Sequence, residues 1–109
     1  MALRIYPVVL QLVRELSPYL PALRARSASL GDQLERALIS VPLNLAEGAY
    51  SRGRNRHARY QSAAASAREA LACLETAEAL GWLAPHEPEL DASFQQVIGT
   101  LVRLVEPRR

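Results

Sequence analysis

The stretch LISVPLNLAEG, residues 38–48, places a proline, an amide and a carboxylate inside one of the most apolar segments of the chain. Pro42 cannot donate a backbone hydrogen bond, and its ring clashes with the carbonyl group of Leu38, so a helix through this segment should bend. Asn44 and Glu47 could bind the backbone groups that the proline leaves without partners, or a neighbouring helix. We interpret this polar seam as a structural motif within a helix. Its members are Pro42, Asn44, Glu47 and Gly48.

Two apolar stripes run along this same helix. The first stripe consists of Leu34, Leu38, Val41 and Leu45. The second stripe lies roughly on the opposite face and consists of Ile39, Leu43, Ala46 and Tyr50. A helix in a single four-helix bundle buries only one stripe, and a second apolar face needs a second partner. Because the other helices already account for one core, we expect the second stripe to contact another subunit of a homo-oligomer.

The composition and the spacing of apolar residues predict an all-α protein. Half of the 109 residues are hydrophobic and only 6% are aromatic, while alanine and leucine, which favour helices, dominate. Apolar residues recur at helical spacing in four segments, so we expect helices at about residues 3–20, 29–50, 55–80 and 88–106. Pro18 and Pro21 should end the first helix and leave residues 21–28 as a linker. Four such helices in one domain, residues 1–109, predict an antiparallel up-down four-helix bundle.

Two helix ends carry recognisable signals. Ser29 and Asp32 have the spacing of a capping box at the start of the second helix. Gly81, followed by the apolar Trp82, has the pattern of a glycine cap at the end of the third helix. The third helix also carries a seam of mostly small residues that would let a neighbouring helix approach closely. This seam consists of Ala63, Ala67, Ala70, Leu74 and Ala77.

The sequence shows no signal for a metal, a cofactor, a membrane span or secretion. The single cysteine, Cys73, excludes an intrachain disulfide and a multi-cysteine metal site, and we expect it to be a buried, inert thiol. No P-loop or glycine-rich dinucleotide turn occurs. No run approaches the ~18 apolar residues of a membrane span, and the apolar N-terminal run has no cleavage site. We therefore expect a cytoplasmic protein that binds neither a metal nor a cofactor.

The residues around Pro42 resemble the signature of the bacterial four-helix-bundle family that includes the proteins encoded in 23S rRNA intervening sequences. In that family the corresponding run is typically Q-L-R-R-A, followed by S-I-P-x-N-I-A-E-G. The matching positions are Gln33, Leu34, Arg36, Ala37, Ser40, Pro42, Asn44, Ala46, Glu47 and Gly48. The third helix of the family and its end are similar to Ser66, Glu69, Leu80, Gly81 and Trp82.

This resemblance implies a compact bundle that forms homo-oligomers, with a ring-shaped homopentamer as the expected form. The accessory variability determinant of diversity-generating retroelements is similar to this family. It forms a basic pentamer, binds nucleic acid and is a partner of a reverse transcriptase. The resemblance therefore implies self-association, and it points to a nucleic acid or a protein as a further partner.

An arginine-rich stretch is the strongest candidate for a functional site. All 13 basic residues are arginine, and no acidic residue lies between Glu47 and Glu69. A guanidinium group binds phosphate through two parallel hydrogen bonds, and Tyr50 and Tyr60 could stack on bases. We place the arginines at a loop-to-helix junction and predict salt-sensitive, sequence-nonspecific binding of RNA or DNA. These residues are Arg52, Arg54, Arg56 and Arg59.

Other functions of the same stretch remain open. It could be a solubilising surface loop on an oligomeric scaffold or on an adaptor for a protein partner. Arg52 and His57 fit the R-x4-H spacing of ribonucleases of the HEPN type, but such a pair arises readily by chance in an arginine-rich chain, and Gly53 argues for a loop. Glu75 and Glu78 have no histidine at metal-binding spacing, and we interpret them as part of a solvated face. We therefore predict a protein that is not an enzyme.

Overall fold

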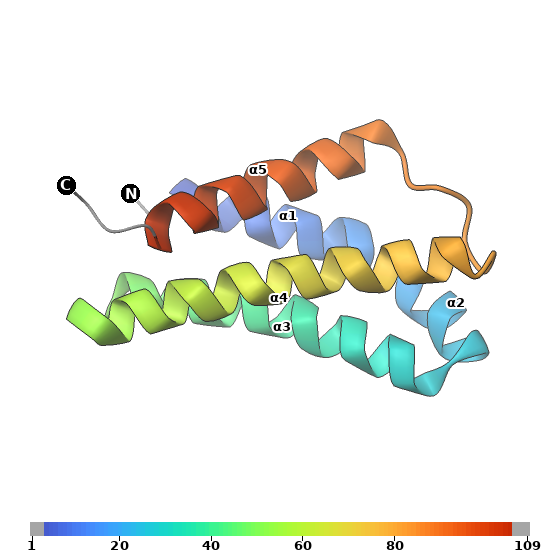
Figure 1. Cartoon of the computed structure of the whole chain (residues 1–109), viewed down its shortest axis with the longest axis horizontal. Coiled ribbons are helices and arrows are strands. Elements are labelled where there is room, and N and C mark those ends of the chain that lie inside the picture. Colours follow the sequence, from blue (N-terminus) through green and yellow to red (C-terminus); the bar gives the residue numbers. More distant parts are fainter. Residues whose placement is uncertain (1–3, 106–109) are drawn as a thin grey trace.

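The computed structural model describes residues 4–105, which form five helices and no strand (Figure 1). The helices are α1 (Tyr6–Leu16), α2 (Tyr19–Arg26), α3 (Ala28–Ala49), α4 (Gly53–Ala79) and α5 (Pro88–Val105). The predicted all-α class is therefore confirmed. Residues 3 and 106, the predicted outer ends of the first and last helices, lie outside the described residues.

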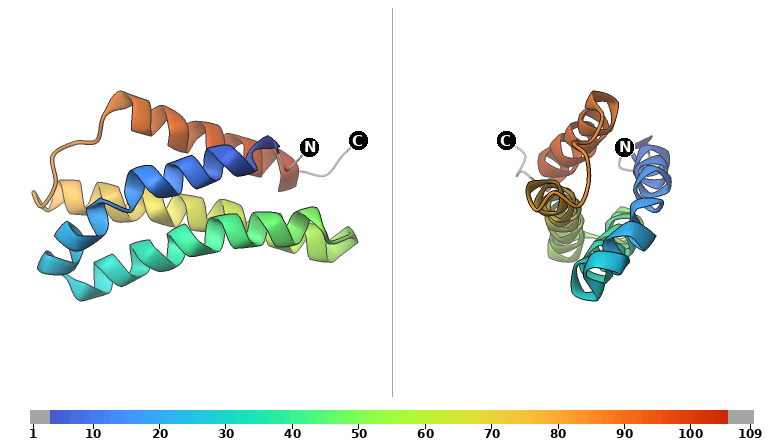
Figure 2. Two further views of the ribbon diagram at one scale, coloured as in Figure 1. Left: turned by 180° about the vertical axis from the view of Figure 1, so that it is seen from behind. Right: turned by 90° about the vertical axis from the view of Figure 1, so that its right-hand side faces the viewer.

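The long helices lie along one axis and alternate in direction (Figure 1). Helix α3 packs against α4, α4 packs against α5, and α1 contacts both α3 and α5, while the short α2 packs against α3. The end-on view in Figure 2 shows α4 and α5 on one side of the molecule and α1, α2 and α3 on the other. With 27 residues, α4 is about 40 Å long at 1.5 Å per residue and spans most of the 44 Å long axis.

The core lies between the helices and consists mainly of leucine, valine and alanine side chains. The predicted seam of small residues on α4, from Ala63 to Ala77, is buried throughout, and so is the first stripe of α3, from Leu34 to Leu45. Because alanine side chains are short, α3 and α4 can approach closely over much of their length. Within residues 4–105, every buried side-chain nitrogen and oxygen atom has a hydrogen-bond partner.

The predicted linker over residues 21–28 is wrong, because most of it is helix α2. Pro18 is the N-cap of α2, and Pro21 is its third residue. The first four N–H groups of a helix have no partner within the helix, so proline is tolerated there. The two prolines therefore start a second helix after the break at Ser17, whereas the sequence prediction used them only to end the first one.

Helix α3 begins earlier than the predicted capping box at Ser29. Ser27 is the N-cap, has an extended backbone, and accepts a hydrogen bond from the N–H group of Leu30 at 3.1 Å. This satisfies one of the free N–H groups at the start of α3, so Ser29 lies inside the helix. Gly31 faces α2, where any larger side chain would collide with Arg24. The close approach of α2 to α3 therefore depends on this glycine.

The predicted glycine cap at the end of α4 is confirmed. Gly81 has a positive φ of 77°, and its N–H group donates to the carbonyl of Glu78 at 3.0 Å. The N–H group of Trp82 donates to the carbonyl of Ala77 at 2.9 Å, which completes a Schellman motif. Trp82 then packs against the core, so the chain turns sharply towards α5. None of the helices described is long and apolar enough to cross a membrane.

Candidate functional site

The polar seam around Pro42 joins α3 to α4 through a short hydrogen-bond network. The side-chain amide of Asn44 donates to the carbonyl oxygen of Ser40 at 3.0 Å and to its hydroxyl at 2.9 Å. The hydroxyl of Ser66 on α4 donates to the same Ser40 hydroxyl at 2.8 Å, and Arg59 donates to the side-chain oxygen of Asn44 at 3.3 Å. The amide of Asn44 thus binds Ser40 on its own helix. The expectation that it binds the backbone group freed by Pro42, the carbonyl of Leu38, is not met by these contacts.

Gly48 allows α4 to cross closely over the end of α3. A Cβ atom at this position would lie 2.5 Å from Cε1 of Tyr60, so the glycine is a packing requirement. Tyr60 is only 5% exposed, because its ring packs against Gly48. The prediction that Tyr60 stacks on bases is therefore wrong, since a buried ring has no free face. Glu47 is exposed on the neighbouring position of α3.

Within residues 4–105, three of the four exposed large apolar side chains belong to the second apolar stripe of α3, which ends at the C-cap Tyr50. Ile39, Leu43 and Tyr50 are 52%, 60% and 83% exposed, and Ala46 between them is half-buried. The four residues are hereafter called the α3 outer stripe. No other helix within residues 4–105 covers it, although the first stripe of α3 is fully packed. The sequence-based division of α3 into an inner and an outer apolar face therefore matches the observed burial.

The four arginines of the predicted site lie at the start of α4. Arg52 is the N-cap, and Arg54, Arg56 and Arg59 lie in the first turns of the helix; all four are exposed. We call them the arginine cluster. Gly53 is the first residue of α4, with a positive φ of 57°, so the expectation that it marks a loop is wrong. A glycine reaches this left-handed conformation without strain, so the helix can begin at this residue.

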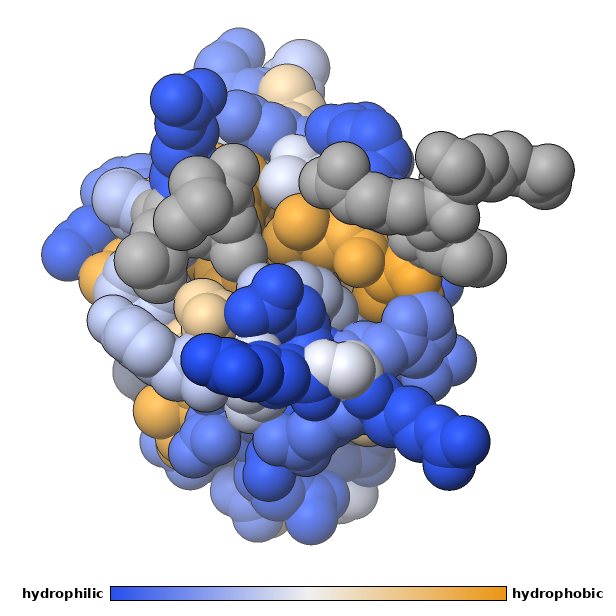
Figure 3. Space-filling view, turned by 90° about the vertical axis from the view of Figure 1, so that its left-hand side faces the viewer, coloured by the Kyte–Doolittle hydropathy of each residue, from blue (hydrophilic) through white to orange (hydrophobic). Residues whose placement is uncertain are grey.

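Positive charge accumulates at this end of the molecule. The first turn of α4 contains no acidic residue, and no side chain caps it. Arg56 donates to the backbone carbonyl of Ser51 at 2.9 Å, and none of the ion pairs formed within residues 4–105 includes the arginine cluster. The partial positive charge of a helix N-terminus adds to that of the guanidinium groups, which favours an anion. Figure 3 shows hydrophilic side chains over the lower part of this end.

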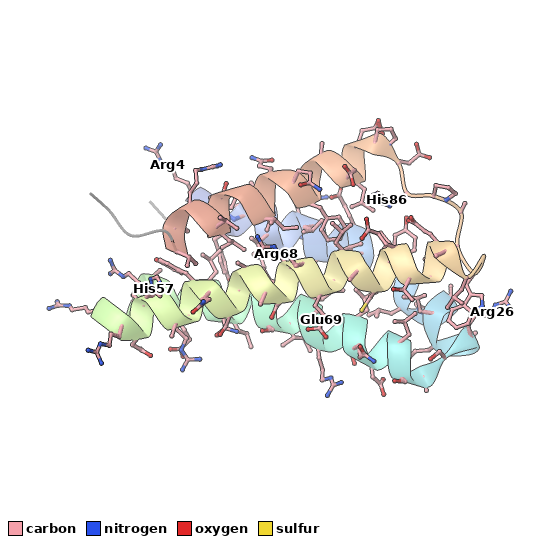
Figure 4. The ribbon with its side chains drawn as sticks, viewed as in Figure 1. Arg4, Arg26, His57, Arg68, Glu69 and His86 are labelled. Atoms are coloured by element: carbon pink, nitrogen blue, oxygen red, sulfur yellow. The ribbon has the colours of Figure 1, made fainter. Side chains whose placement is uncertain are left out.

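His57 lies in the second turn of α4 and is exposed, at the left end of the molecule in Figure 4. The structure gives it no hydrogen bond or ion pair to any other described residue. A general base usually needs a neighbour that orients its ring. Arg52 and His57 are both exposed, so together they supply only two solvent-exposed polar or cationic groups.

A histidine cluster at the other end of the molecule was missed by sequence reasoning. Nδ1 of His86 lies 2.6 Å from Oε2 of Glu78, and Nε2 lies 3.0 Å from Oδ1 of Asp91. The backbone N–H group of His86 donates to the same Glu78 oxygen at 3.0 Å, and the imidazole ring meets Phe94 edge to face. The interpretation of Glu78 as part of a solvated face is therefore wrong. The cluster fastens the linker between α4 and α5 to both helices.

The hydrogen bonds to Asp91 and to Glu78 raise the pKa of His86 above its ordinary value of 6.5. A protonated imidazole donates from both ring nitrogens, which suits the two carboxylates on either side. The described residues contain no group of three or more His, Cys, Asp and Glu side chains that could hold a metal ion. No local sequence signal identifies this cluster, because Glu78 precedes the linker and Asp91 lies on the next helix.

Cys73 is buried on α4, as predicted. Burial, with a smaller contribution from the negative charge of Glu69, raises the pKa of its thiol above the ordinary value of 9.0. A thiol with a raised pKa carries little thiolate at neutral pH, so it is a poor nucleophile. Cys73 therefore contributes to packing between the helices.

Residues 4–105 thus form a helical protein with an uncovered apolar stripe on α3 and an arginine-rich end at the start of α4. The model of the 23S rRNA-intervening sequence protein family matches residues 3–103, so the chain belongs to this family. The match confirms the family that the motif around Pro42 indicated. No significant match to a curated protein or to a solved structure was found.

Proposed function

We propose that the chain self-associates through the α3 outer stripe and forms a homo-oligomeric ring, with five copies as the expected number. The exposure of Ile39, Leu43 and Tyr50 on one helix face carries this proposal. Contiguous apolar surface of this kind marks an interaction site more often than a free surface. Each copy would be an antiparallel up-down four-helix bundle in which α1 and α2 together take the place of one helix. The ring itself is implied by the resemblance to the family.

The assembled protein would bind RNA or DNA through the arginine cluster, without reading the base sequence. The support is chemical: four exposed arginines lie within eight residues at a helix N-terminus, and no carboxylate within the described chain neutralises them. In a ring this cluster is repeated in every copy, so contacts that are weak singly would add up along one nucleic acid. Arg56 and Arg59 are already oriented by Ser51 and Asn44.

The protein would act in the cytoplasm as a binding protein and would catalyse no reaction. His57 is its only histidine near the arginine cluster, and Cys73 is buried, so neither is placed as an activated nucleophile or base. The second candidate function is an oligomeric scaffold or an adaptor for a protein partner. The exposed α3 outer stripe supports this second candidate as well as the first, because a scaffold or an adaptor needs an apolar interaction surface but no nucleic acid.

Fluorescence anisotropy with a short labelled RNA and a labelled DNA duplex, over a series of salt concentrations, tests the nucleic-acid proposal. The wild type is expected to bind both, with an affinity that falls steeply as salt rises. Changing Arg52, Arg54, Arg56 and Arg59 together to alanine should abolish this binding. The matched control changes four exposed arginines elsewhere, namely Arg14, Arg26, Arg36 and Arg103, to alanine. It removes the same charge and should retain most of the binding.

The outcomes separate the candidate functions. Equal losses in both variants would show that net charge alone attracts the nucleic acid, and would reject the arginine cluster as a site. No binding by the wild type at low salt would leave the scaffold or adaptor function. RNA cleavage by the wild type that is lost in His57→Ala would instead identify a ribonuclease. Leu43→Asp tests the self-association separately, because a charge in the stripe should give monomers with unchanged helix content.

A further inference from the structure

A second partly apolar surface lies between α4 and α5. It is a shallow groove of about 320 Å³. Its lining residues are Gln61, Ala64, Ala65, Arg68, Val102 and Val105. Alanine side chains on α4 make the groove, because they are too short to fill the space between the two helices. Figure 4 shows Arg68 at this place, between α4 and α5.

Arg68 is an exposed cation at the edge of this apolar groove. Its nearest acidic residue in sequence, Glu69, points to another side of α4 in Figure 4. Among the ion pairs found in residues 4–105, none includes Arg68. A partner that covers the groove would remove water from this guanidinium group, so the partner should supply a carboxylate.

The α3 outer stripe has such a carboxylate beside it. Glu47 follows Leu43 by four residues and precedes Tyr50 by three, so it borders the stripe on the helix surface. Its side chain is exposed and enters none of the ion pairs that the described residues form. The stripe is therefore an apolar ridge with a negative charge at its edge, and the groove is an apolar hollow with a positive charge at its edge.

We propose that the α3 outer stripe of one copy docks into the α4–α5 groove of a second copy, with Glu47 of the first paired to Arg68 of the second. This inference rests on the proposed self-association and names the surface that receives the stripe. The contact joins two different surfaces, so every copy offers one stripe and one groove. Such a heterologous contact leads to a ring or a filament and not to a two-fold dimer.

A two-fold contact between two α3 outer stripes is the main rival. Arg36 is exposed on the same helix, and an antiparallel pair of α3 helices could bring it near Glu47 of the other copy. That arrangement would leave the α4–α5 groove and Arg68 uncovered. The groove contact covers both apolar surfaces and pairs both free charges, and we favour it for this reason.

A mixing experiment distinguishes the two arrangements. Leu43→Asp disables the stripe but keeps the groove, and Ala65→Glu places a charge in the groove but keeps the stripe; both positions are exposed, so both variants should fold. Each variant alone should be monomeric in light scattering after size-exclusion chromatography. An equimolar mixture, at the concentration at which the wild type assembles, should give a dimer with one copy of each variant. A stripe-to-stripe contact would instead give a dimer of Ala65→Glu by itself, because its stripe is intact, and that dimer would contain no copy of Leu43→Asp.

Charge reversal supplies a second measurement. Glu47→Arg and Arg68→Glu should each weaken the assembly about tenfold, and the double variant should restore it. Restoration by Arg36→Glu in place of Arg68→Glu would instead establish the stripe-to-stripe contact. Circular dichroism of each variant checks that its helix content is unchanged.

The failures of the two proposals are separable. If Leu43→Asp is monomeric but no mixed dimer forms, the stripe is an interface and the groove is not its partner. If the wild type is monomeric, or if Leu43→Asp retains the size of the wild-type assembly, the proposed self-association through the stripe is overturned, and the groove contact with it.

Discussion

The two ends of the molecule differ in whether their charged side chains have partners of opposite charge. At the start of α4, the arginine cluster is exposed, and within residues 4–105 no carboxylate pairs with it. Towards the other end, the imidazole of His86 lies between Glu78 and Asp91, with only 11% of its side chain exposed (Figure 4). Charge that is satisfied internally stabilises the fold, while charge left in solvent is free to bind a partner. This contrast predicts that changes at the first end affect binding and changes at the second affect stability.

The largest effect is expected from the arginine cluster. Changing all four arginines to alanine removes up to four phosphate contacts and should lower the affinity for nucleic acid about a thousandfold at 0.1 M salt. Changing them to lysine retains the charge but loses the planar guanidinium group, so the loss should be about tenfold with a similar salt dependence. Anisotropy titrations at several salt concentrations measure both quantities. Equal affinity of the lysine and alanine variants would contradict a role for charge.

Gly48 is the exception at the arginine end, because its effect should be on stability. Gly48→Val forces the ring of Tyr60 away from α3 and should lower the free energy of unfolding by about 3 kcal/mol. Denaturant unfolding followed by circular dichroism measures this. Gly99→Ala on α5 is the control, because that position has room for a methyl group, and alanine should stabilise the helix by about 0.5–1 kcal/mol. Similar losses in both variants would show that the contact with Tyr60 does not limit packing.

The histidine cluster should make stability depend on pH. The folded state raises the pKa of His86, so the protonated ring stabilises the fold fully below its ordinary pKa of 6.5, and this contribution is lost as pH rises through the higher folded value. At pH 6, His86→Ala should therefore lower the free energy of unfolding by about 1–2 kcal/mol, and the difference from wild type should shrink at higher pH. Unfolding curves at several pH values measure it.

His57 is the matched control for this prediction, because it is the other histidine of the chain and is exposed. At pH 6, His57→Ala should change the free energy of unfolding by no more than about 0.5 kcal/mol, because the side chain is exposed. If the pH dependence of stability persists in His86→Ala, other groups cause it. The hydrogen bonds of the histidine cluster would then contribute little to the free energy of unfolding.

The smallest effects compare the glycine that begins α4, Gly53, with the glycine just beyond its end, Gly81. Gly53 and Gly81 both have positive φ, and a Cβ atom at either position would meet no other atom within 4 Å. Only the backbone strain of a left-handed alanine remains, so Gly53→Ala and Gly81→Ala should each lower stability by about 1 kcal/mol. Thermal unfolding of the two variants measures this. A much larger loss for Gly81→Ala would mean that the Schellman motif, and not the strain alone, holds the linker in place.

Much of the local structure could be predicted because its signals lie within a few residues of one another. The two faces of α3 follow from helical periodicity, and the cap at Gly81 follows from one glycine and the apolar residue after it. The position of the arginine cluster also followed from the sequence, although the helix starts at Gly53 and not after it. Signals of this kind depend on neighbouring residues only, so a single chain reveals them.

Errors occurred where one local signal admits two outcomes. Pro18 and Pro21 can end one helix or begin the next. In the structure they begin α2, because a helix here buries Leu23 in the core. Ser27 and Ser29 can both cap a helix, and the extended backbone at Ser27 decided between them. In each case the start of the helix depends on how the helices pack against one another, and a local sequence pattern does not contain this information.

The sequence by itself determined the helical class, the family, the inner and outer faces of α3, and the place where arginines accumulate. Only the tertiary structure decided that Tyr60 is buried against Gly48, that His86 is held by Glu78 and Asp91, and that a groove lies between α4 and α5. The physical reason is the range of the interactions. Periodicity and capping act between residues three to five positions apart, whereas these contacts join separate helices or the linker between them, and they exist only after the helices have packed together.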